Sequence, residues 1–236
     1  DAACNGRAHP TGVMGAMSLD SKPGYTTVQA AVGGSGENNL ELCTKGSIES
    51  TSKLVREAST VSGGFITVLR NPIDCAYIKN HSAVGALSMC IQAGEVFLSN
   101  QGQAQEILMG LEDLYGSQVL ATGMTEDFDL KARGGFDVGS VSVRDHDKLV
   151  KVIFWNEYMT VEDQDGRLAT FPDLIALLDA DTGLPICSAQ LSNGQRVHVV
   201  RTPRQNLLLS STMFDKNLYI PCEDAIGKEL ISYVFP

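Results

Sequence analysis

Four side chains that can take part in catalysis or metal binding lie within the first ten residues, DAACNGRAHP. They are a carboxylate, a thiol, a guanidinium and an imidazole: Asp1, Cys4, Arg7 and His9. A carboxylate can activate water, an imidazole can transfer a proton or bind a metal ion, and a guanidinium can hold an anion. The cluster is therefore either part of an active site or a chemically silent chain start, and the residue types alone leave both interpretations open.

Glu157 follows the apolar run VIFW and is a further candidate carboxylate, although its spacing alone favours a strand end that faces water. The other histidines favour structural roles: His146 lies in a hairpin turn, His198 in the strand-like run RVHVV, and His81 near a helix end. The GxSxG elbow, the HExxH zinc helix and the GxxxxGK(S/T) phosphate loop are absent from the sequence. GGSGEN has the glycines of a phosphate loop without its flanking strand and helix, which favours an ordinary loop.

Composition limits the partners and the compartment. The 236 residues carry a formal net charge of −10, and clustered Lys and Arg are missing, so nucleic acid is not expected as a partner. No stretch approaches the roughly 20 apolar residues that a membrane span needs. The six cysteines are scattered without a CxxC pair, which favours reduced thiols, several of them buried, in a cytoplasmic protein. A homo-oligomer is compatible with these features.

The first half of the chain predicts helices separated by glycine-rich loops. One helix begins near Ser47 or Ser50, whose hydroxyls can cap it, and ends at Gly63. A short buried strand is expected over residues 65–70, followed by a helix with Asn71 as its N-cap. Two further helices are expected over residues 86–99 and 102–116. One or two strands are too few for an α/β layer, and with the absent initiator methionine this predicts a missing upstream segment.

The second half has the pattern of a β-rich domain. A hairpin turn at Asp145-His146-Asp147 and a two-residue turn at Asp165-Gly166 separate apolar runs. Further strands are expected over residues 174–180, around residue 186, and over 196–202 and 217–221. The predicted division is an α/β domain over 1–117, incomplete at its N-terminus, and a β-rich domain over 118–236. Arg133-Gly134-Gly135 is predicted to provide a flexible crossing.

Several segments together resemble the S-methyl thiohydantoin desulfurase-like family, a group of hydantoinase/oxoprolinase-related proteins. RLATFPDLIALLDADTGLPI followed by LSNGQRVHVV is similar to the C-terminal signature of that family. FWNEYMTVEDQDG resembles its Asn-Glu strand and hairpin, and RGGFDVGSVSV the entry to its β domain. DAACNGRAHP is similar to the GRA-containing segment, and REASTVSGG to the arginine-containing helix end. These matches occur in family order over nearly the whole chain.

The resemblance implies an α/β domain followed by a β-rich, swivelling-type domain in cytoplasmic proteins, with about a hundred residues ahead of the segment that matches DAACNGRAHP. It implies a hydrolase in which water replaces sulfur on a small five-membered ring, so a cyclic amide or thiohydantoin is the expected partner. On this basis Asp1 would activate water or bind a metal ion, and Arg7 would orient an anion. His9 would act as an acid, a base or a metal ligand, and Glu157 would close the site. A divalent metal such as zinc, bound by Asp1 and His9, is compatible with this chemistry.

A non-catalytic role remains as an alternative at this stage. The chain would then be a subunit of a hydantoinase-type assembly or a module that binds a small metabolite, and the polar cluster would be structural. A cleft that holds a carboxylate, an arginine and a histidine with perturbed pKa values would favour catalysis. An exposed apolar patch on the β domain would favour the subunit.

Overall fold

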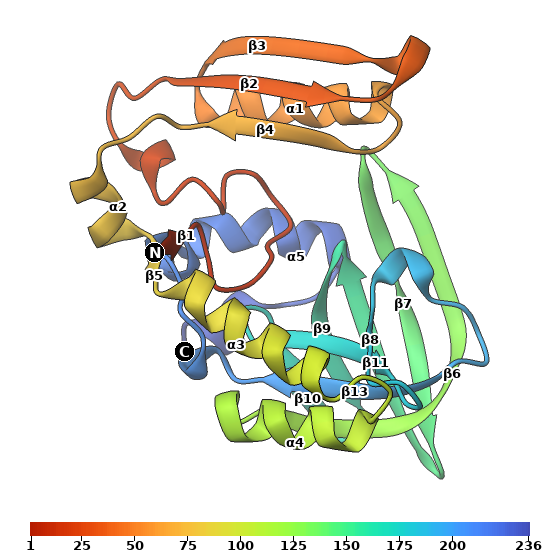
Figure 1. Ribbon diagram of the computed structural model, residues 1–236. Helices are drawn as coiled ribbons and strands as arrows, with labels where there is room; N and C mark the ends of the chain where they lie inside the picture. Colours follow the sequence, from red (N-terminus) through yellow and green to blue (C-terminus); the bar gives the residue numbers. More distant parts are fainter.

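The computed structural model describes residues 1–236, apart from the side chain of Arg133. It shows a mixed α/β protein with a small three-stranded sheet at one end and an open eight-stranded antiparallel sheet, which is not a barrel (Figure 1). The N-terminal loop and helix α5 (Ile220–Ile226) lie between the two sheets in this view. Among the described residues, no helix has both the length and the apolar character that crossing a membrane requires.

The small sheet has strands β2 (Thr27–Gly33), β3 (Leu40–Gly46) and β4 (Ile66–Arg70) in the antiparallel order β3-β2-β4. The expected shortage of strands in this half is therefore wrong, because β2 and β3 flank the GGSGEN loop. Strand β4 is present as predicted, but it is an edge strand rather than a buried one, and Leu69 is 81% exposed. Helix α1 (Ile48–Val61) packs on one face of the sheet, and Ser47 Oγ caps it by accepting from the Ser50 N–H at 3.2 Å.

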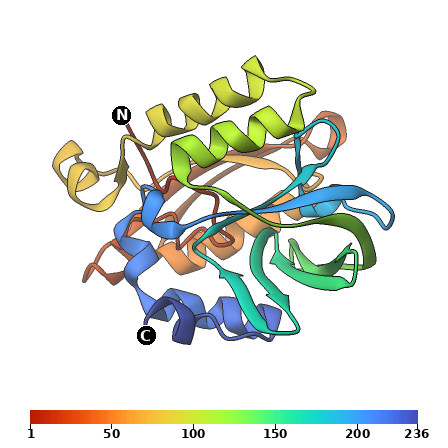
Figure 2. The same ribbon diagram turned by 90° about the horizontal axis from the view of Figure 1, so that it is seen from below.

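Helices α2 (Cys75–His81), α3 (Ala86–Ser99) and α4 (Ala104–Tyr115) follow the small sheet. The prediction of α3 and α4 is confirmed, whereas the N-cap of α2 is Asp74 and not Asn71. Asn71 is buried, has φ 56°, and receives a 2.7 Å hydrogen bond from the Thr27 hydroxyl, so it ties β4 to β2 instead. Figure 2 shows α3 and α4 side by side on one side of the molecule.

The large sheet has the strand order β10-β9-β8-β7-β6-β13-β11-β12, with antiparallel neighbours. Its strands are β6 (Gln118–Arg133), β7 (Phe136–Asp145), β8 (Lys148–Trp155), β9 (Glu157–Asp163), β10 (Gly166–Thr170), β11 (Leu174–Asp179), β12 (Pro185–Ile186) and β13 (Arg196–Thr202). Inward-facing valines such as Val141, Val152 and Val199 are fully buried in its core, as the period-two pattern of a half-buried strand requires.

Two predictions for the second half are wrong. Gly134 and Gly135, both with positive φ, form the tight turn between β6 and β7, so no flexible crossing exists there. The expected strand over 217–221 is instead a 3₁₀ turn (Lys216–Tyr219) that leads into α5, because Pro221 at the start of the helix suits a helical first turn. The division at 117/118 and the swivelling type of the second part stay predictions.

A second core joins the C-terminal helices α5 and α6 (Ile231–Val234) to the N-terminal loop and the large sheet. Met14 from the loop, Trp155 and Phe171 from the sheet region, and Tyr219 and Leu230 from the C-terminal segment are each at most 7% exposed. This core fixes the N-terminal loop, which carries Arg7 and His9, against the end of β8. It therefore brings segments from both ends of the chain to one place.

Candidate functional site

A pocket of about 610 Å³ lies where the N-terminal loop, helix α1, the large sheet and the C-terminal segment meet. We call it the α1 pocket. Its walls are residues 11–13 of the loop, Asp20 and Tyr25, residues of α1 between Ser47 and Arg56, Phe136 and Trp155 of the sheet, and Leu218 and Pro221. A pocket of this volume suits a small organic molecule.

Aromatic rings and a fixed arginine form one wall of the α1 pocket. The Phe136 and Trp155 rings are 4.6 Å apart between centroids, and the Arg56 guanidinium lies 3.7 Å from the Phe136 ring centroid. Arg56 also donates to Gly135 O at 2.8 Å and to Pro10 O at 3.3 Å. Burial and the nearby Arg70 lower the pKa of Arg56. Carbonyl groups and a ring thus hold this cation without neutralising it.

Two buried hydroxyls that line the pocket lack hydrogen-bond partners among the described residues. Ser52 Oγ has none, and Tyr25 OH approaches Thr27 without completing a hydrogen bond. Unpaired buried hydroxyls cost free energy, and a ligand that bonds to them recovers it. Neither residue stood out in the sequence, because a serine in a helix and a tyrosine after a turn carry no distinguishing spacing.

Arg7 does not line the α1 pocket and is 7% exposed. Its Nε donates to Ala8 O at 2.8 Å, its Nη1 donates to Asp173 O, and its guanidinium lies 4.4 Å from the Phe171 ring centroid. Burial lowers the pKa of Arg7 to about 10 even though Glu157, Tyr219 and Asp173 raise it. Its Nη2 is buried and has no partner among the described residues, so one strong donor remains free.

Glu157 lies near Arg7 and next to Trp155, which lines the α1 pocket, but Glu157 itself does not line it. It is the cross-strand partner of Trp155 at the tight turn through Asn156, and such opposite residues project from the same face of a sheet. Burial raises the pKa of Glu157, and the charge of Arg7 opposes this rise. The described residues offer its carboxylate no hydrogen bond or ion pair. Arg7 and Glu157 are therefore close enough for their charges to interact, but they form no hydrogen bond with each other, and Arg7 Nη2 stays without a partner.

Asp173 belongs to the same region, although the sequence indicated only that it could cap a turn. Its side chain is 3% exposed and accepts from Arg201 Nε at 2.7 Å and from the Arg204 N–H at 2.9 Å. Because its backbone carbonyl also accepts from Arg7, Asp173 links the buried arginine to the strand β13 region. The signal that could have identified it was its place in the PDLI block.

His9 packs against Gly15 of the N-terminal loop. Its Nδ1 lies 2.9 Å from Thr11 O, and since a carbonyl only accepts, Nδ1 carries the ring proton and Nε2 is free to accept. A Cβ at Gly15 would lie 2.6 Å from His9 Cε1, so only glycine fits there. Burial lowers the pKa of His9 to about 4, and Arg70 and Arg7 contribute to this shift. The imidazole is accordingly neutral at pH 7.

Asp1 is placed with different partners from Arg7, His9 and Glu157. Strand β1 (Ala2–Ala3) pairs with β5 (Ala83–Val84), and Asp1 Oδ2 accepts from the Ser88 N–H at 2.8 Å and from its hydroxyl. Asp1 thus caps helix α3. No group of three or more His, Cys, Asp and Glu residues suited to a metal ion occurs among the described residues, so Asp1 and His9 do not supply a built metal site. All six cysteines are free, but Cys222 alone is buried and the other five are exposed, so the expectation of several buried thiols is wrong.

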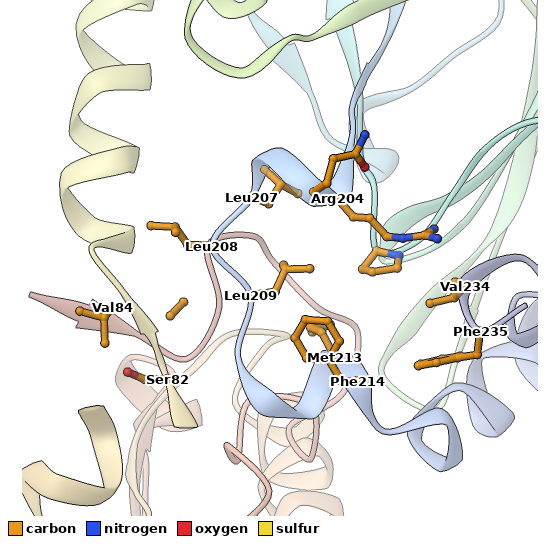
Figure 3. Close-up of a pocket in the computed structure, with 13 residues that line it drawn as sticks. Ser82, Val84, Arg204, Leu207, Leu208, Leu209, Met213, Phe214, Val234 and Phe235 are labelled. Atoms are coloured by element: carbon orange, nitrogen blue, oxygen red, sulfur yellow. The ribbon is translucent and has the colours of Figure 1, made fainter. Parts of the chain in front are cut away.

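A second pocket of about 560 Å³, lined in part by Pro172, is mainly apolar. Figure 3 shows Leu207, Leu209, Met213 and Phe235 around it, with Arg204 at one side. It offers few groups that could transfer a proton or bind an anion. The α1 pocket is therefore the better candidate for a functional site.

The fold and this geometry define a mixed α/β protein with a pocket of small-molecule size beside a buried arginine and carboxylate. The sequence profile of the S-Me-THD-like family, C-terminal domain, matches residues 47–215, and the chain belongs to this family. The expected resemblance is therefore confirmed. The family is related to thiohydantoin desulfurase.

One solved structure supports the fold. The X-ray crystal structure of a protein from Chromobacterium violaceum is similar, with a TM-score of 0.66 and 19% sequence identity. The similarity covers 95% of this chain and 63% of that protein, so this chain spans under two thirds of the length of its structural relative. No curated protein matches the chain.

Proposed function

We propose that this protein acts in hydrolysis at a small five-membered cyclic amide or thiohydantoin, with the ring bound in the α1 pocket. One observation carries the proposal: three segments that bear the family resemblance contribute a residue each to this pocket, and the chain that directly follows a fourth contributes as well, whereas the C-terminal signature over residues 167–200 does not. Residues 11–13 directly follow GRAHP, Arg56 lies in REASTVSGG, Phe136 in RGGFDVGSVSV, and Trp155 in FWNEYM. Phe136 and Trp155 come from the paired strands β7 and β8, but the N-terminal loop and helix α1 are distant from them in sequence and still line the same pocket.

The pocket suits a planar polar ring. The apolar faces of Trp155 and Phe136 provide a surface on which such a ring can stack. The Ser52 and Tyr25 hydroxyls can bond to its ring nitrogen and carbonyl oxygen. A site that combines a stacking surface with a few convergent polar groups is typical for small-molecule binding.

Glu157 is the proposed general base and Arg7 its positioning partner. Glu157 takes a proton from water as the water oxygen bonds to the ring carbon that carries sulfur. The π electrons of the carbon–nitrogen double bond move to the ring nitrogen, which takes up the remaining proton of the water. The proton held by Glu157 passes to sulfur as the carbon–sulfur bond breaks, so that a ring carbonyl, a ring N–H and a free thiol result. A carboxyl whose pKa is raised by burial is a stronger base than an exposed one, which suits this step. Asp1 has no role in this scheme because its carboxylate caps α3, and no step is assigned to a metal ion.

The test is release of methanethiol from an S-methyl thiohydantoin, followed with a thiol reagent. We expect Glu157→Gln to lower kcat at least about 100-fold, because a general base is lost. Glu126→Gln is the matched control, since Glu126 pairs with Arg144 on the exposed sheet surface. Full turnover in Glu157→Gln, or no thiol release by the unaltered protein, would refute the proposal.

The pH dependence gives an independent measure of the Arg7 role. Activity that needs ionised Glu157 falls as the pH drops through its raised pKa. Because the Arg7 charge lowers the pKa of Glu157, Arg7→Gln should move this acidic limb of kcat/KM to higher pH. A limb that stays in place would show that Arg7 does not act through Glu157.

A subunit role is the second candidate, because the small sheet has an exposed apolar face. Val28 and Val32 on β2 and Leu69 on β4 are 43%, 54% and 81% exposed. Exposed apolar groups of this kind are typical of protein interaction surfaces. Binding of the ring without any thiol release, even when the substrate is in excess, would favour this candidate over catalysis.

A further inference from the structure

One face of the small sheet is apolar and exposed. Helix α1 packs on the opposite face, where the fully buried Gln29 amide donates to Thr51 Oγ1 at 2.8 Å. Side chains alternate along a strand, so the residues of β2 on either side of Gln29 project from the other face. That face, which we call the outer face, carries these exposed apolar residues of the three strands: Val28, Ala30, Val32, Cys43 and Leu69.

Two opposite charges lie at the two ends of the outer face. Glu41 and Lys45 are exposed on the edge strand β3, two residues before and after Cys43 and on the same side of the sheet. At about 3.4 Å per residue they are roughly 13 Å apart, too far to pair with each other. Neither forms an ion pair among the described residues. Between them runs the middle row of the face, in which Cys43 is opposite Ala30 and Ala30 is opposite Leu69.

This pattern is complementary to itself. A two-fold axis that lies between two stacked sheets and runs along the middle row reverses the direction of the strands. It therefore places Lys45 of each copy opposite Glu41 of its partner, so that two ion pairs form. It also places Val28 against Val32 of the partner, and Leu69 against Leu69. Two sheets can stack in this way about 10 Å apart, with their strands within about 30° of each other.

We propose that the outer face binds a second copy of this chain in such a two-fold dimer. The contact buries the apolar side chains of both copies, and the two ion pairs fix their relative position. The face is small compared with the about 20 to 30 residues a side of a standard interface, so we expect a dissociation constant of about 10–100 μM. None of its residues lines the α1 pocket, so the dimer does not depend on the proposed hydrolase activity.

Sedimentation at rising protein concentration tests the dimer through its charges. Lys45→Glu gives each copy two acidic groups that oppose the same two of the partner, and it should weaken the dimer at least about tenfold. Glu41→Lys should do the same with two basic groups. The double variant exchanges the charges and should dimerise as the unaltered chain does, and an equal mixture of the two single variants should form a mixed dimer. Lys216→Glu, on the exposed turn before α5, is the control for net charge.

Two results of this experiment would overturn the proposal. One is a monomer at all concentrations up to roughly 500 μM, which would leave the outer face to a different partner. The other is a dimer that both single charge variants leave intact.

Edge pairing of β3 with a second β3 is the competing arrangement, because it also sets Glu41 beside Lys45. It would leave Leu69, on the far edge strand β4, outside the contact. Leu69→Ser should therefore weaken the stacked dimer at least about tenfold, because an apolar side chain is no longer buried. Leu98→Ser, which removes a leucine that is 70% exposed on α3, is the matched control. An unchanged dimer in Leu69→Ser, with the fold checked by circular dichroism, would overturn the stacked dimer.

Cys43 gives a direct readout, since the axis passes beside it and it faces Cys43 of the partner. Sheets about 10 Å apart are too distant for a disulfide but within reach of a short bismaleimide linker. A covalent dimer should form with this linker and be lost in Cys43→Ser. Cys90→Ser, which removes an exposed thiol on α3, should leave it unchanged. Crosslinking that persists in Cys43→Ser would contradict the proposed arrangement.

Discussion

Arg7 shows how the chain keeps a charged side chain in its interior. Removing a guanidinium from water is costly, and two carbonyls, the Phe171 ring and nearby carboxylates offset this cost only in part, since the pKa of Arg7 still falls. Nη2 has no hydrogen-bond partner among the described residues, so the cost of burying this donor is not offset. A buried charged group that costs stability and keeps a free donor is more readily explained by binding or catalysis than by folding.

His9 should make stability depend on pH in the mildly acidic range. Its pKa is about 4 in the folded protein and near 6.5 when unfolded, so the unfolded chain takes up a proton first as the pH falls. Stability should therefore decrease from about pH 6.5 to pH 4, by up to roughly 3 kcal/mol. In His9→Gln this part of the decrease in the free energy of unfolding should be absent. Urea unfolding of both proteins at pH 7.5 and 5 checks it, and equal losses would contradict the assignment.

Helices and tight turns were predicted well from the sequence, whereas several strands were missed. Helices α1, α3 and α4 have their caps and glycine stops within a few residues, and the hairpin turns at His146 and Asp165 are equally local. Strands β2, β3 and β6 have polar residues and glycines among their apolar ones, and they become strands through pairing with partners elsewhere. Propensity is a weak guide where cross-strand contacts decide the structure.

Asp1 belongs to helix α3 as a cap, and its substitution should act on stability. The Ser88 N–H is one of the free donors in the first turn of α3, and Asp1 Oδ2 satisfies it at 2.8 Å. We expect Asp1→Ala to lower the free energy of unfolding by about 1 kcal/mol, and Asp1→Asn by less, because an amide oxygen still accepts. Thiol release should be unaffected when it is measured about 20 °C below the melting point of the variant. A selective loss of kcat in Asp1→Asn would restore the catalytic role expected from the sequence.

Both ends of the chain contribute to the core that supports the site. Met14, Tyr219 and Leu230 lie outside residues 47–215, which match the family profile, yet they are almost completely buried together with Trp155 and Phe171. Buried Asn5 receives hydrogen bonds from the Ser210 N–H and hydroxyl at 3.0 and 2.8 Å. The α1 pocket therefore depends on segments on either side of the matched region.

A chain reduced to residues 47–215 should fail to fold cooperatively. It would lose β2, which pairs with β4, and β3, which pairs with β2. It would also lose three large apolar side chains of the second core. Each such loss costs several kcal/mol, comparable to the whole stability of a domain. Urea titration monitored by circular dichroism, with the 236-residue chain as control, checks this. A sharp transition near that of the full chain would contradict it.

The amino-acid sequence was enough to place helices α1, α3 and α4, the hairpin turns, the β-rich second half and the family, because caps, turn residues and ordered motifs are local signals. It also singled out Arg7, His9 and Glu157, whose catalytic roles stay proposals. It did not predict Ser52 and Tyr25 as parts of the α1 pocket, or the buried position of Asp173. Arg7 and Asp173 are separated by 166 residues in the chain, and Asn5 and Ser210 by 205. Such contacts arise when distant segments bury their apolar faces together, and no local pattern encodes which segments meet.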